Sequence, residues 1–322
     1  MGESVAEKVL VTREIPPAGL RALEPFDVRV LHERPPGREE LLDAVRGVSG
    51  VLSTATENVD GELMDAAGED LRVVANMAVG YDNVDVEAAA ERGVVVTNTP
   101  GVLDETTADV AFMLLLAAAR RLGEGERLLR AGRWEWWGPK QLVGRDVWGK
   151  RLGIVGFGRI GQAVARRAKG FGMEILYHNR SRKVGAEQEL GARYLDLDEL
   201  LESADFVSVH TPLSVETHHL IGAAELGMMK PEAIFVNTSR GPVVDEAALA
   251  DALVEGRIFA AGLDVYEEEP EVHPKLLELE NVVLAPHIGS ASVETRDRMA
   301  ALAAENIVAV LSGEEPKTPV GR

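Results

Sequence analysis

The sequence predicts an α/β fold with two doubly wound parallel sheets in two domains, and three observations lead to this expectation. The chain has 322 residues, about twice the length of a typical single domain. Short apolar runs of strand length alternate with helix-like stretches, as in a parallel sheet covered by helices. This alternation occurs in two separate series, without a fixed-period repeat or a low-complexity tract.

The first series of expected strands lies in the N-terminal third of the chain. Helix-like stretches at 38–46 and 86–92 separate some of these strands, and turn signals bound each one. This alternation of strands and helices, with short connections between them, is typical of a parallel sheet covered by helices. The expected strands of this series are residues 9–13, 28–32, 50–53, 73–77 and 94–97.

The second series begins after residue 150 and has the same character. Its apolar runs are again short, and several are followed directly by glycine or by polar residues. A second parallel sheet is therefore expected. Its strands are residues 152–156, 174–178, 206–210, 234–237, 261–265 and 282–285.

Two long helical stretches define the expected domain boundaries. The stretch 104–120 is apolar nearly all round, so we expect a helix that is buried on most sides, between the domains. The stretch 292–311 has apolar residues at helical spacing but no sheet of its own, so we expect it to return to the first domain. The expected domains are 1–100 plus 287–322, and 101–286.

Composition excludes several classes of protein and site. A net charge of −19 and an isoelectric point near 4.9 argue against nucleic-acid and anionic-membrane partners. The absence of cysteine excludes disulfides, thiolate zinc sites and cysteine nucleophiles, and no metal site is expected. The N-terminus lacks a signal-peptide core, and the longest apolar run, 110–119, is too short to span a bilayer. A cytoplasmic location is the expectation.

A glycine-rich turn follows the expected strand 152–156. Gly156 permits a tight turn, Gly158 lets the backbone approach a pyrophosphate, and Gly161 allows a helix to pack closely on the strand. The following helix, 162–169, would offer its N-terminal N–H groups to phosphate. With a further strand close behind, this arrangement is typical of a Rossmann dinucleotide-binding domain, although glycine turns of purely structural use also occur.

The residues after strand 174–178 predict which dinucleotide binds. An acidic residue there, about 20 positions after the glycine turn, would bind the ribose 2′-hydroxyl of NAD. This chain has instead Asn179-Arg180-Ser181-Arg-Lys, with no carboxylate before Glu187. Arg180 can bind a 2′-phosphate, and Asn179 and Ser181 can donate to it. We therefore expect NADP(H), with NAD(H) possible; the alternative is a solvated basic loop.

Three consecutive strand ends of the second sheet carry candidate catalytic groups. His287 follows strand 282–285, Arg240 follows strand 234–237, and three glutamates lie in the segment 266–270. Carboxyl ends of strands are where open α/β sheets bind ligands. Reduction of a 2-oxoacid requires a cation for the carboxylate, a proton donor for the carbonyl oxygen and a carboxylate that keeps the donor protonated. Each of these residues alone would more often be structural.

An ordered set of motifs resembles the D-2-hydroxyacid dehydrogenase family over essentially the whole chain, and the glyoxylate/hydroxypyruvate reductase branch most closely. The resemblance implies a flavodoxin-like substrate domain, a Rossmann domain and a cleft between them. The segments that carry it are 76–83, 96–103, 107–109, 156–161, Asn237-Thr-Ser-Arg-Gly241, 264–270 and Ala285-Pro-His-Ile-Gly289.

The resemblance also implies roles for single residues. Arg240 would bind the substrate, Glu269 would hold the histidine, and His287 would be the acid/base. The backbone of Val79 and Gly80 would donate to the substrate carboxylate. For Thr107 and Asp264, capping is an equal alternative to cofactor contact. The implied cofactor-binding residues are Thr107, Gly156, Phe157, Gly158, Arg159, Ile160, Gly161, Asn179, Arg180, Ser181, Thr238, Ser239, Arg240, Asp264, His287 and Gly289.

The four tryptophans, Trp134, Trp136, Trp137 and Trp148, all fall in one short window. A simple core would scatter them along the chain. The family resemblance makes the region near 120–150 a dimerisation arm, and tryptophan is enriched at interfaces. We hypothesise a homodimer in which Trp136 or Trp137 reaches the neighbour's substrate pocket; the alternative is a local surface cluster.

Together these features predict reduction of a small 2-oxoacid, glyoxylate or hydroxypyruvate, to glycolate or D-glycerate with NADPH. An NAD-dependent 3-phosphoglycerate dehydrogenase is the nearest alternative, but nothing here looks like a basic cradle for a substrate phosphate. A dinucleotide-sensing protein that resembles transcriptional co-repressors of the same fold is the alternative from another class.

Overall fold

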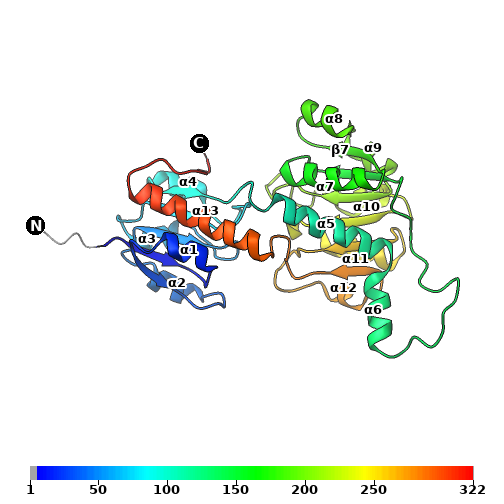
Figure 1. Cartoon of the computed structure of the whole chain (residues 1–322), viewed down its shortest axis with the longest axis horizontal. Helices are drawn as coiled ribbons and strands as arrows, with labels where there is room; N and C mark the ends of the chain where they lie inside the picture. Colours follow the sequence, from blue (N-terminus) through cyan, green and yellow to red (C-terminus); the bar gives the residue numbers. More distant parts are fainter. Residues whose placement is uncertain (1–5, 322) are drawn as a thin grey trace, which may run out of the picture. The chain divides into compact units, whose positions relative to one another are not determined.

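A computed structural model describes residues 6–321 of the chain. The chain divides into two compact units: unit 1 is Met1–Leu103 with Ser290–Arg322, and unit 2 is Asp104–Gly289. Each unit is a parallel sheet with helices packed on it (Figure 1). The predicted fold class, two doubly wound parallel-sheet α/β domains, is confirmed.

The sheet of unit 1 has five parallel strands among the described residues, in the order β2-β1-β3-β4-β5. This is the flavodoxin-like strand order. Val9 of β1 pairs with Val28 of β2 on one side and with Gly50 of β3 on the other. The ends of all five strands lie within two residues of their expected positions. The strands are β1 (Lys8–Val11), β2 (Asp27–Val30), β3 (Gly50–Ser53), β4 (Val73–Asn76) and β5 (Val95–Thr97).

The C-terminal helix α13 (Val293–Leu311) packs on α1 (Pro17–Ala22) and on strands β3 and β4, all in unit 1 (Figure 1). The expectation that this helix returns to the first domain is therefore confirmed. Gly19 of α1 permits the close approach, since a Cβ there would lie 2.9 Å from the carbonyl oxygen of Ala300. The other helices of unit 1 are α2 (Arg38–Ala44), α3 (Gly61–Ala67) and α4 (Val86–Glu91).

The boundaries between the units lie three residues beyond the expected positions, 100 and 286. The first boundary coincides with the start of α5 at Asp104. At the second, residues 287–289 lie in unit 2, and their backbone N–H groups all donate to Asp264 of the same unit. Sequence alone does not reveal these three hydrogen bonds.

The sheet of unit 2 has seven parallel strands within the described ranges, in the order β12-β11-β10-β9-β6-β7-β8. The chain order of the strands reverses between β6 and β9, since the strand numbers rise to β8 on one side of this point and to β12 on the other. This is the topological switch point of a Rossmann fold. Strand β8 (Arg193–Tyr194) was not predicted, because two residues give no periodic signal. The others are β6 (Arg151–Val155), β7 (Glu174–His178), β9 (Phe206–Val209), β10 (Ile234–Asn237), β11 (Ala260–Leu263) and β12 (Val282–Leu284).

Helix α5 (Asp104–Ala119) packs within unit 2 on α7 (Arg159–Gly170) and on strands β10 to β12. Gly262 of β11 lets it approach, since a Cβ there would lie 2.8 Å from Leu114 Cβ. The helix is buried on most sides as expected. The remaining helices of unit 2 are α6 (Leu122–Arg130), α8 (Val184–Leu190), α9 (Leu197–Ser203), α10 (Ala223–Met228), η1 (Gly241–Val243), α11 (Glu246–Val254) and α12 (Pro274–Glu278).

Two clusters of apolar side chains cover opposite faces of the unit 2 sheet. Alternate residues of one strand enter different clusters: Ile234 and Val236 of β10 pack in one, and Phe235 packs in the other. Because these strands are buried on both faces, their polar groups are concentrated at the strand ends. Among the described residues, no helix is long and apolar enough to cross a membrane.

Candidate active site

His287 and Glu269 form a hydrogen-bonded pair at the carboxyl edge of the unit 2 sheet. His287 Nδ1 lies 2.7 Å from Glu269 Oε2. His287 follows β12, and Glu269 lies in the connection between β11 and β12. The side chains are 38% and 30% exposed, so a small molecule can reach both. Within the described residues, His287 Nε2 makes no hydrogen bond of its own.

Several groups keep Glu269 ionised. Burial acts to raise the pKa of Glu269, but the hydrogen bond and charge of His287 oppose it. The backbone N–H of Tyr266 donates to the second carboxylate oxygen at 3.1 Å, and the charge of Arg240 acts in the same direction. Together they hold the pKa of Glu269 below its ordinary value. The role of Tyr266 was not predicted from the sequence, because the type of side chain does not show which backbone N–H groups donate to a functional residue.

The turn that presents His287 is fixed by Asp264. His287 has a left-handed backbone, with φ at 53°, and its N–H donates to the Asp264 carbonyl at 2.9 Å. The N–H groups of Ile288 and Gly289 donate to the two Asp264 carboxylate oxygens, each at 2.7 Å. Burial raises the pKa of Asp264 in spite of these donors. The capping alternative for Asp264 is thus observed directly.

Arg240 lies at the end of β10, next to β11 in the sheet. Asn237 shapes this turn: its Nδ2 donates to the Arg240 carbonyl at 2.9 Å, and its Oδ1 accepts from the Ser239 N–H at 3.0 Å. Gly241 must be glycine, since a Cβ there would lie 1.8 Å from the Tyr266 carbonyl oxygen. The structure therefore brings Arg240 towards the glutamate that holds His287.

Two threonines among the predicted cofactor-binding residues lie at this same edge. Thr107 of α5 is buried, and its methyl group is 3.4 Å from where a Gly289 Cβ would be. Thr238 is also buried, and its Oγ1 has no hydrogen-bond partner in the part of the chain that the structure describes. A buried hydroxyl without a partner is costly, so this position favours a polar ligand.

The glycine turn after β6 has the shape that a dinucleotide requires. Gly156 has φ at 96°, and a Cβ there would lie 2.6 Å from the His210 carbonyl carbon. A Cβ on Gly161 would lie 2.3 Å from the Gly156 oxygen, so the helix can approach the strand only with glycine at this position. Around Gly158 there is open space. The close contacts agree with the tight turn expected at Gly156 and the close packing expected at Gly161, and the approach of a pyrophosphate to Gly158 stays a prediction.

Helix α7 leaves its first N–H groups open. No side chain caps Gly158, and the first intrahelical bond runs from Gln162 N–H to the Gly158 carbonyl. The N–H groups of Arg159, Ile160 and Gly161 therefore have no intrahelical acceptor. Such a terminus, with its positive dipole, binds phosphate. These residues fit the pyrophosphate of a nicotinamide dinucleotide.

Further buried polar atoms lie at the end of β9, beside the switch point. His210 Nδ1 and Thr211 Oγ1 have no partner among the described residues, while His210 Nε2 lies 2.8 Å from Ser208 Oγ. Burial lowers the pKa of His210 to about 3, so its ring is neutral at physiological pH. With Thr238, these atoms make the edge suitable for a polar ligand.

Phe157 and Asn179 stabilise the glycine turn itself. The Phe157 ring is fully buried and stacks on Tyr177, with the ring centroids 4.2 Å apart. Its N–H donates to Asn179 Oδ1 at 3.1 Å, and Asn179 Nδ2 donates to the Ser181 carbonyl at 2.9 Å. The Asn179 side chain, which follows β7, therefore connects the glycine turn after β6 to the turn after β7.

The basic loop after β7 has one paired and one exposed arginine. Arg182 pairs with Glu187 at 2.6 Å, and Glu187 also accepts a 2.5 Å hydrogen bond from the Tyr177 hydroxyl. Arg180 is exposed, and the structure gives it no ion pair within residues 6–321. The Ser214 hydroxyl first, and more weakly the Arg180 charge, hold the pKa of Glu216 below its usual value. Arg180 is thus the arginine left for a ligand.

In unit 1, Val79 and Gly80 lie in the turn after β4. Asn98 Nδ2 donates to the Val79 carbonyl at 2.8 Å, and Asn76 Nδ2 donates to the Gly80 carbonyl at 3.0 Å. Among the described residues, the N–H groups of Val79 and Gly80 have no acceptor. Sequence reasoning did not include these two asparagines, which fix the turn so that its N–H groups stay available.

The chain is similar in sequence and in structure to known proteins. The family model of the D-isomer specific 2-hydroxyacid dehydrogenase, NAD binding domain, matches residues 112–289. A glyoxylate reductase from Thermococcus litoralis is 52% identical over 321 residues, covering 98% of this chain and 97% of that protein. A protein from Thermus thermophilus has a similar structure, with a TM-score of 0.92, 48% identity, and coverage of 98% of this chain and 100% of that one.

A second solved structure has a bound ligand. It is an NADPH-dependent glyoxylate/hydroxypyruvate reductase from Sinorhizobium meliloti, in complex with NADP and malonate. It is 40% identical to this chain, with a TM-score of 0.87, and the match covers 98% of this chain and 97% of that one. The similarity therefore extends across both units.

Proposed function

The chain belongs to the D-isomer specific 2-hydroxyacid dehydrogenase family, and from this premise we propose that it reduces glyoxylate or hydroxypyruvate to glycolate or D-glycerate, with NADPH preferred. The hydrogen bond between His287 and Glu269, at the same sheet edge as Arg240, carries this proposal. The relatives that are glyoxylate reductases support the choice of a small 2-oxoacid.

The proposed chemistry assigns one task to each side chain. When bound, a nicotinamide dinucleotide supplies the hydride that reduces C2 of the oxoacid. His287 gives the proton on Nε2 to the carbonyl oxygen, so the C=O bond becomes a C–OH group. Glu269 holds Nδ1–H and stabilises the charged imidazole. Neutral His287 then regains its proton from water.

Arg240 binds the substrate carboxylate in this proposal. Its planar guanidinium can donate two parallel hydrogen bonds to a carboxylate, which also fixes the orientation of the carbonyl. The N–H groups of Val79 and Gly80 would bind the same substrate, since both lack an acceptor among the described residues.

The preference for NADPH rests on Arg180. Its exposed guanidinium suits a 2′-phosphate, and Ser181, the next residue in sequence, has a hydroxyl that can donate to the same group. The nearest carboxylate along the chain, Glu187, already binds Arg182 and Tyr177 and so does not neutralise Arg180. NADH remains the alternative donor, and the relative rates with the two cofactors distinguish them.

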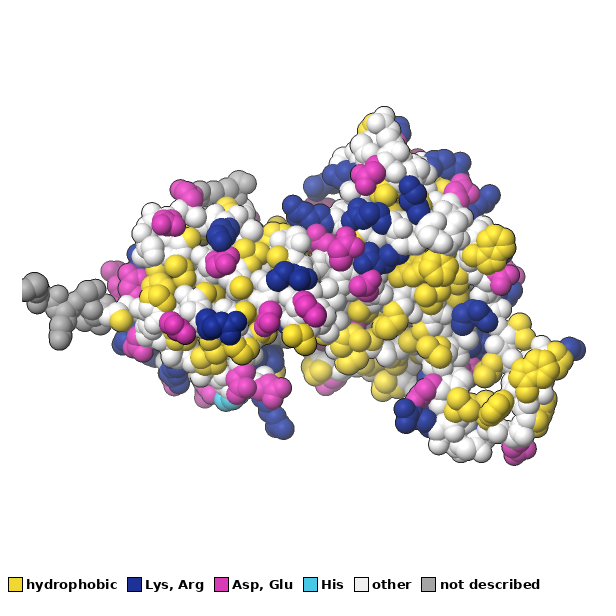
Figure 2. All heavy atoms as spheres, in the orientation of Figure 1, with side chains coloured by type: hydrophobic (Ala, Val, Ile, Leu, Met, Phe, Trp, Pro, Cys, Tyr) yellow, Lys and Arg dark blue, Asp and Glu magenta, His cyan; other side chains and the backbone are white. Residues whose placement is uncertain are grey.

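We also propose that the chain forms a homodimer through the tryptophan region. Trp136 and Trp137 are 67% and 76% exposed, and Leu122 and Leu129 of α6 are exposed beside them in sequence. Figure 2 shows hydrophobic side chains gathered over the loop that follows α6. An apolar surface of this kind is typical of an interface. Light scattering that gives the mass of a single chain would disprove the dimer.

Initial rates of NADPH and NADH oxidation test the proposed function. The substrates are glyoxylate, hydroxypyruvate, pyruvate and phosphohydroxypyruvate, each measured separately. The proposal predicts the highest kcat/KM for one of the first two with NADPH. A preference for NADH with phosphohydroxypyruvate would make the protein a 3-phosphoglycerate dehydrogenase. Tight dinucleotide binding without any turnover would favour the sensor.

A further inference from the structure

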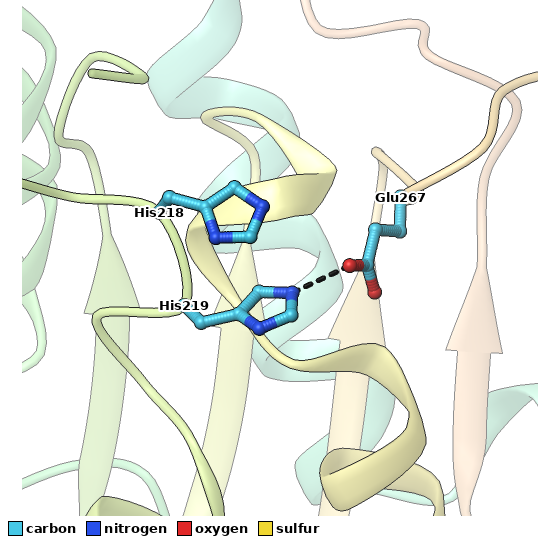
Figure 3. A group of neighbouring side chains, drawn as sticks. All are labelled: His218, His219 and Glu267. Atoms are coloured by element: carbon cyan, nitrogen blue, oxygen red, sulfur yellow. Dashed lines mark hydrogen bonds and ion pairs between the residues drawn. The ribbon is translucent and has the colours of Figure 1, made fainter. Parts of the chain in front are cut away.

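Two histidines and a glutamate form a second cluster in unit 2, separate from the His287 pair. His218 and His219 lie in the connection between β9 and α10, and Glu267 lies in the segment after β11. One donor atom from each residue lies within 4.8 Å of the others. Figure 3 shows the two imidazole rings one above the other, with the Glu267 carboxylate facing His219. The site thus joins two segments distant in sequence.

The contacts inside the cluster are close. His219 Nε2 lies 2.5 Å from Glu267 Oε1. The rings of His218 and His219 stack with centroids 4.1 Å apart. Two imidazoles beside one carboxylate are the donor set that borderline divalent ions such as Zn²⁺ prefer.

The glutamate of the cluster is held in place by its surroundings. Glu267 N–H donates to Glu246 Oε2 at 2.7 Å, and Glu246 N–H donates back to Glu267 Oε2 at 3.2 Å. Glu246 is buried and also accepts from the His273 N–H. The hydrogen bond to Glu267 Oε2 fixes the carboxylate, so that Oε1 is directed towards His219. Outer contacts of this type orient the ligands of metal sites.

The backbone of His219 is unusual for a side-chain-bearing residue. Its φ is 51°, in the left-handed region, and its N–H donates to the Pro242 carbonyl at 2.8 Å. Only four described non-glycine residues have a positive φ, and the catalytic candidate His287 is another. Strained positions of this kind occur where the surrounding structure directs a side chain to a task.

The geometry requires only small side-chain movements to hold an ion. A tetrahedral zinc site with bonds of about 2.0–2.1 Å places its ligand atoms about 3.3 Å apart. The donors of this cluster already lie between 2.5 Å and 4.8 Å from one another. The ion would replace the proton between His219 and Glu267, and water would complete the coordination. The exposed side chains of His218 and His219 can make these adjustments through rotation, while Glu267 stays in place.

We propose that His218, His219 and Glu267 bind one divalent transition-metal ion of the Zn²⁺ class. The ion joins the β9–α10 connection to the segment that carries Glu269, and so stabilises unit 2. The net charge of −19 favours cation binding in general, while the two imidazoles select a borderline ion over Mg²⁺ or Ca²⁺. This inference does not depend on the proposed dehydrogenase activity.

The chain contains its own control for this site. In unit 1, the exposed His32 lies 3.1 Å from Glu40 but has no second imidazole beside it among the described residues. A lone histidine–carboxylate pair offers two ligands and should bind Zn²⁺ much more weakly. His32→Asn therefore reports any ion that simply associates with exposed histidines.

The test is calorimetric titration of the full chain, free of any histidine tag, with ZnCl₂. We expect one saturable site per chain, weakened at least about tenfold in His219→Asn and Glu267→Gln, and unchanged in His32→Asn. Asparagine tolerates the left-handed backbone at 219, and dinucleotide binding by each variant checks its fold. The absence of a saturable site, or equal binding by Glu267→Gln, would overturn the proposal.

A second measurement locates the ion without relying on activity. Zn²⁺ should raise the thermal unfolding midpoint of the wild type and leave that of Glu267→Gln unchanged, because only a native-state ligand stabilises. His287→Gln should keep the full effect. If the rise is lost in His287→Gln and kept in Glu267→Gln, the ion binds at the catalytic pair and the proposal is wrong.

Discussion

The N–H of His287 donates to the carbonyl of Asp264 at 2.9 Å, and the Asp264 carboxylate accepts the next two N–H groups of the chain. Asp264 thus fixes the left-handed turn at the end of β12 with three hydrogen bonds. The position of the His287 ring relative to Glu269 follows from this turn. Asp264 is a positioning residue for the candidate acid/base.

Asp264→Asn should therefore impair His287 indirectly. An amide can accept from only one of the two N–H groups of Ile288 and Gly289, and its own NH₂ would face the other donor. We expect kcat to fall more than about tenfold, and unfolding free energy to fall by about 1–3 kcal/mol. Steady-state kinetics and urea denaturation measure the two effects. Unchanged kcat would show that the turn does not depend on this carboxylate.

Gly241→Ala should displace Arg240. The new Cβ would lie 1.8 Å from the Tyr266 carbonyl oxygen, so the backbone of one segment must move. We expect KM for the oxoacid to rise at least about tenfold and stability to fall by about 3 kcal/mol. Gly227→Ala in α10 is the control, because nothing lies within 4 Å of its added methyl group. Equal behaviour of the two variants would contradict this account of Gly241.

Arg180→Asp should reverse the cofactor preference. Loss of a charged hydrogen bond to the 2′-phosphate, replaced by repulsion, should raise KM for NADPH at least about tenfold, with a smaller effect on NADH. Arg182→Ala is the matched control, because Arg182 is already bound to Glu187. The ratio of kcat/KM for the two cofactors is the measurement. An unchanged ratio in Arg180→Asp would remove the basis for NADPH.

Glu57 in unit 1 should contribute stability that depends on pH. Burial acts to raise the pKa of Glu57, but hydrogen bonds from Arg13 and from Thr54 and Thr56 together hold it below the usual 4.5. Its stabilisation is therefore complete above pH 4.5 and is lost as the pH falls through the lower folded-state pKa.

Glu57→Gln should accordingly destabilise the protein by about 1–3 kcal/mol near pH 7, and by progressively less below pH 4.5. Thermal unfolding of wild type and variant between about pH 7 and pH 3 measures the difference. The exposed Glu69→Gln serves as control and should show little change at any pH. A difference that grows as the pH falls would contradict the direction of the pKa shift.

Much of the fold could be predicted from the sequence, because the parallel strands are buried on both faces and appear as continuous apolar runs. The same reasoning placed α13 on the first sheet. It missed β8, because two residues give no periodic signal. The expected helix 104–120 also ends at Ala119, and Arg121, with φ at 51°, separates it from α6.

The family resemblance inferred from the motifs is confirmed by the matching family model and by a relative of 52% identity. The side chains at strand ends could be assigned to one site from the sequence, because the topology of a parallel sheet brings the carboxyl ends of its strands together. Backbone donors were not, so the role of the Tyr266 N–H emerged only from the structure. The structural roles of the asparagines at 76, 98, 179 and 237 escaped notice for a similar reason, since each side chain bonds to main-chain atoms.

The central claim is that His287, held by Glu269, protonates the oxoacid. Its most direct test is kcat of His287→Gln with glyoxylate at saturating NADPH, with NADPH affinity measured in parallel. The account predicts a loss of at least about 10²-fold in kcat with NADPH affinity kept within a few-fold. Turnover by His287→Gln at the wild-type rate would contradict it.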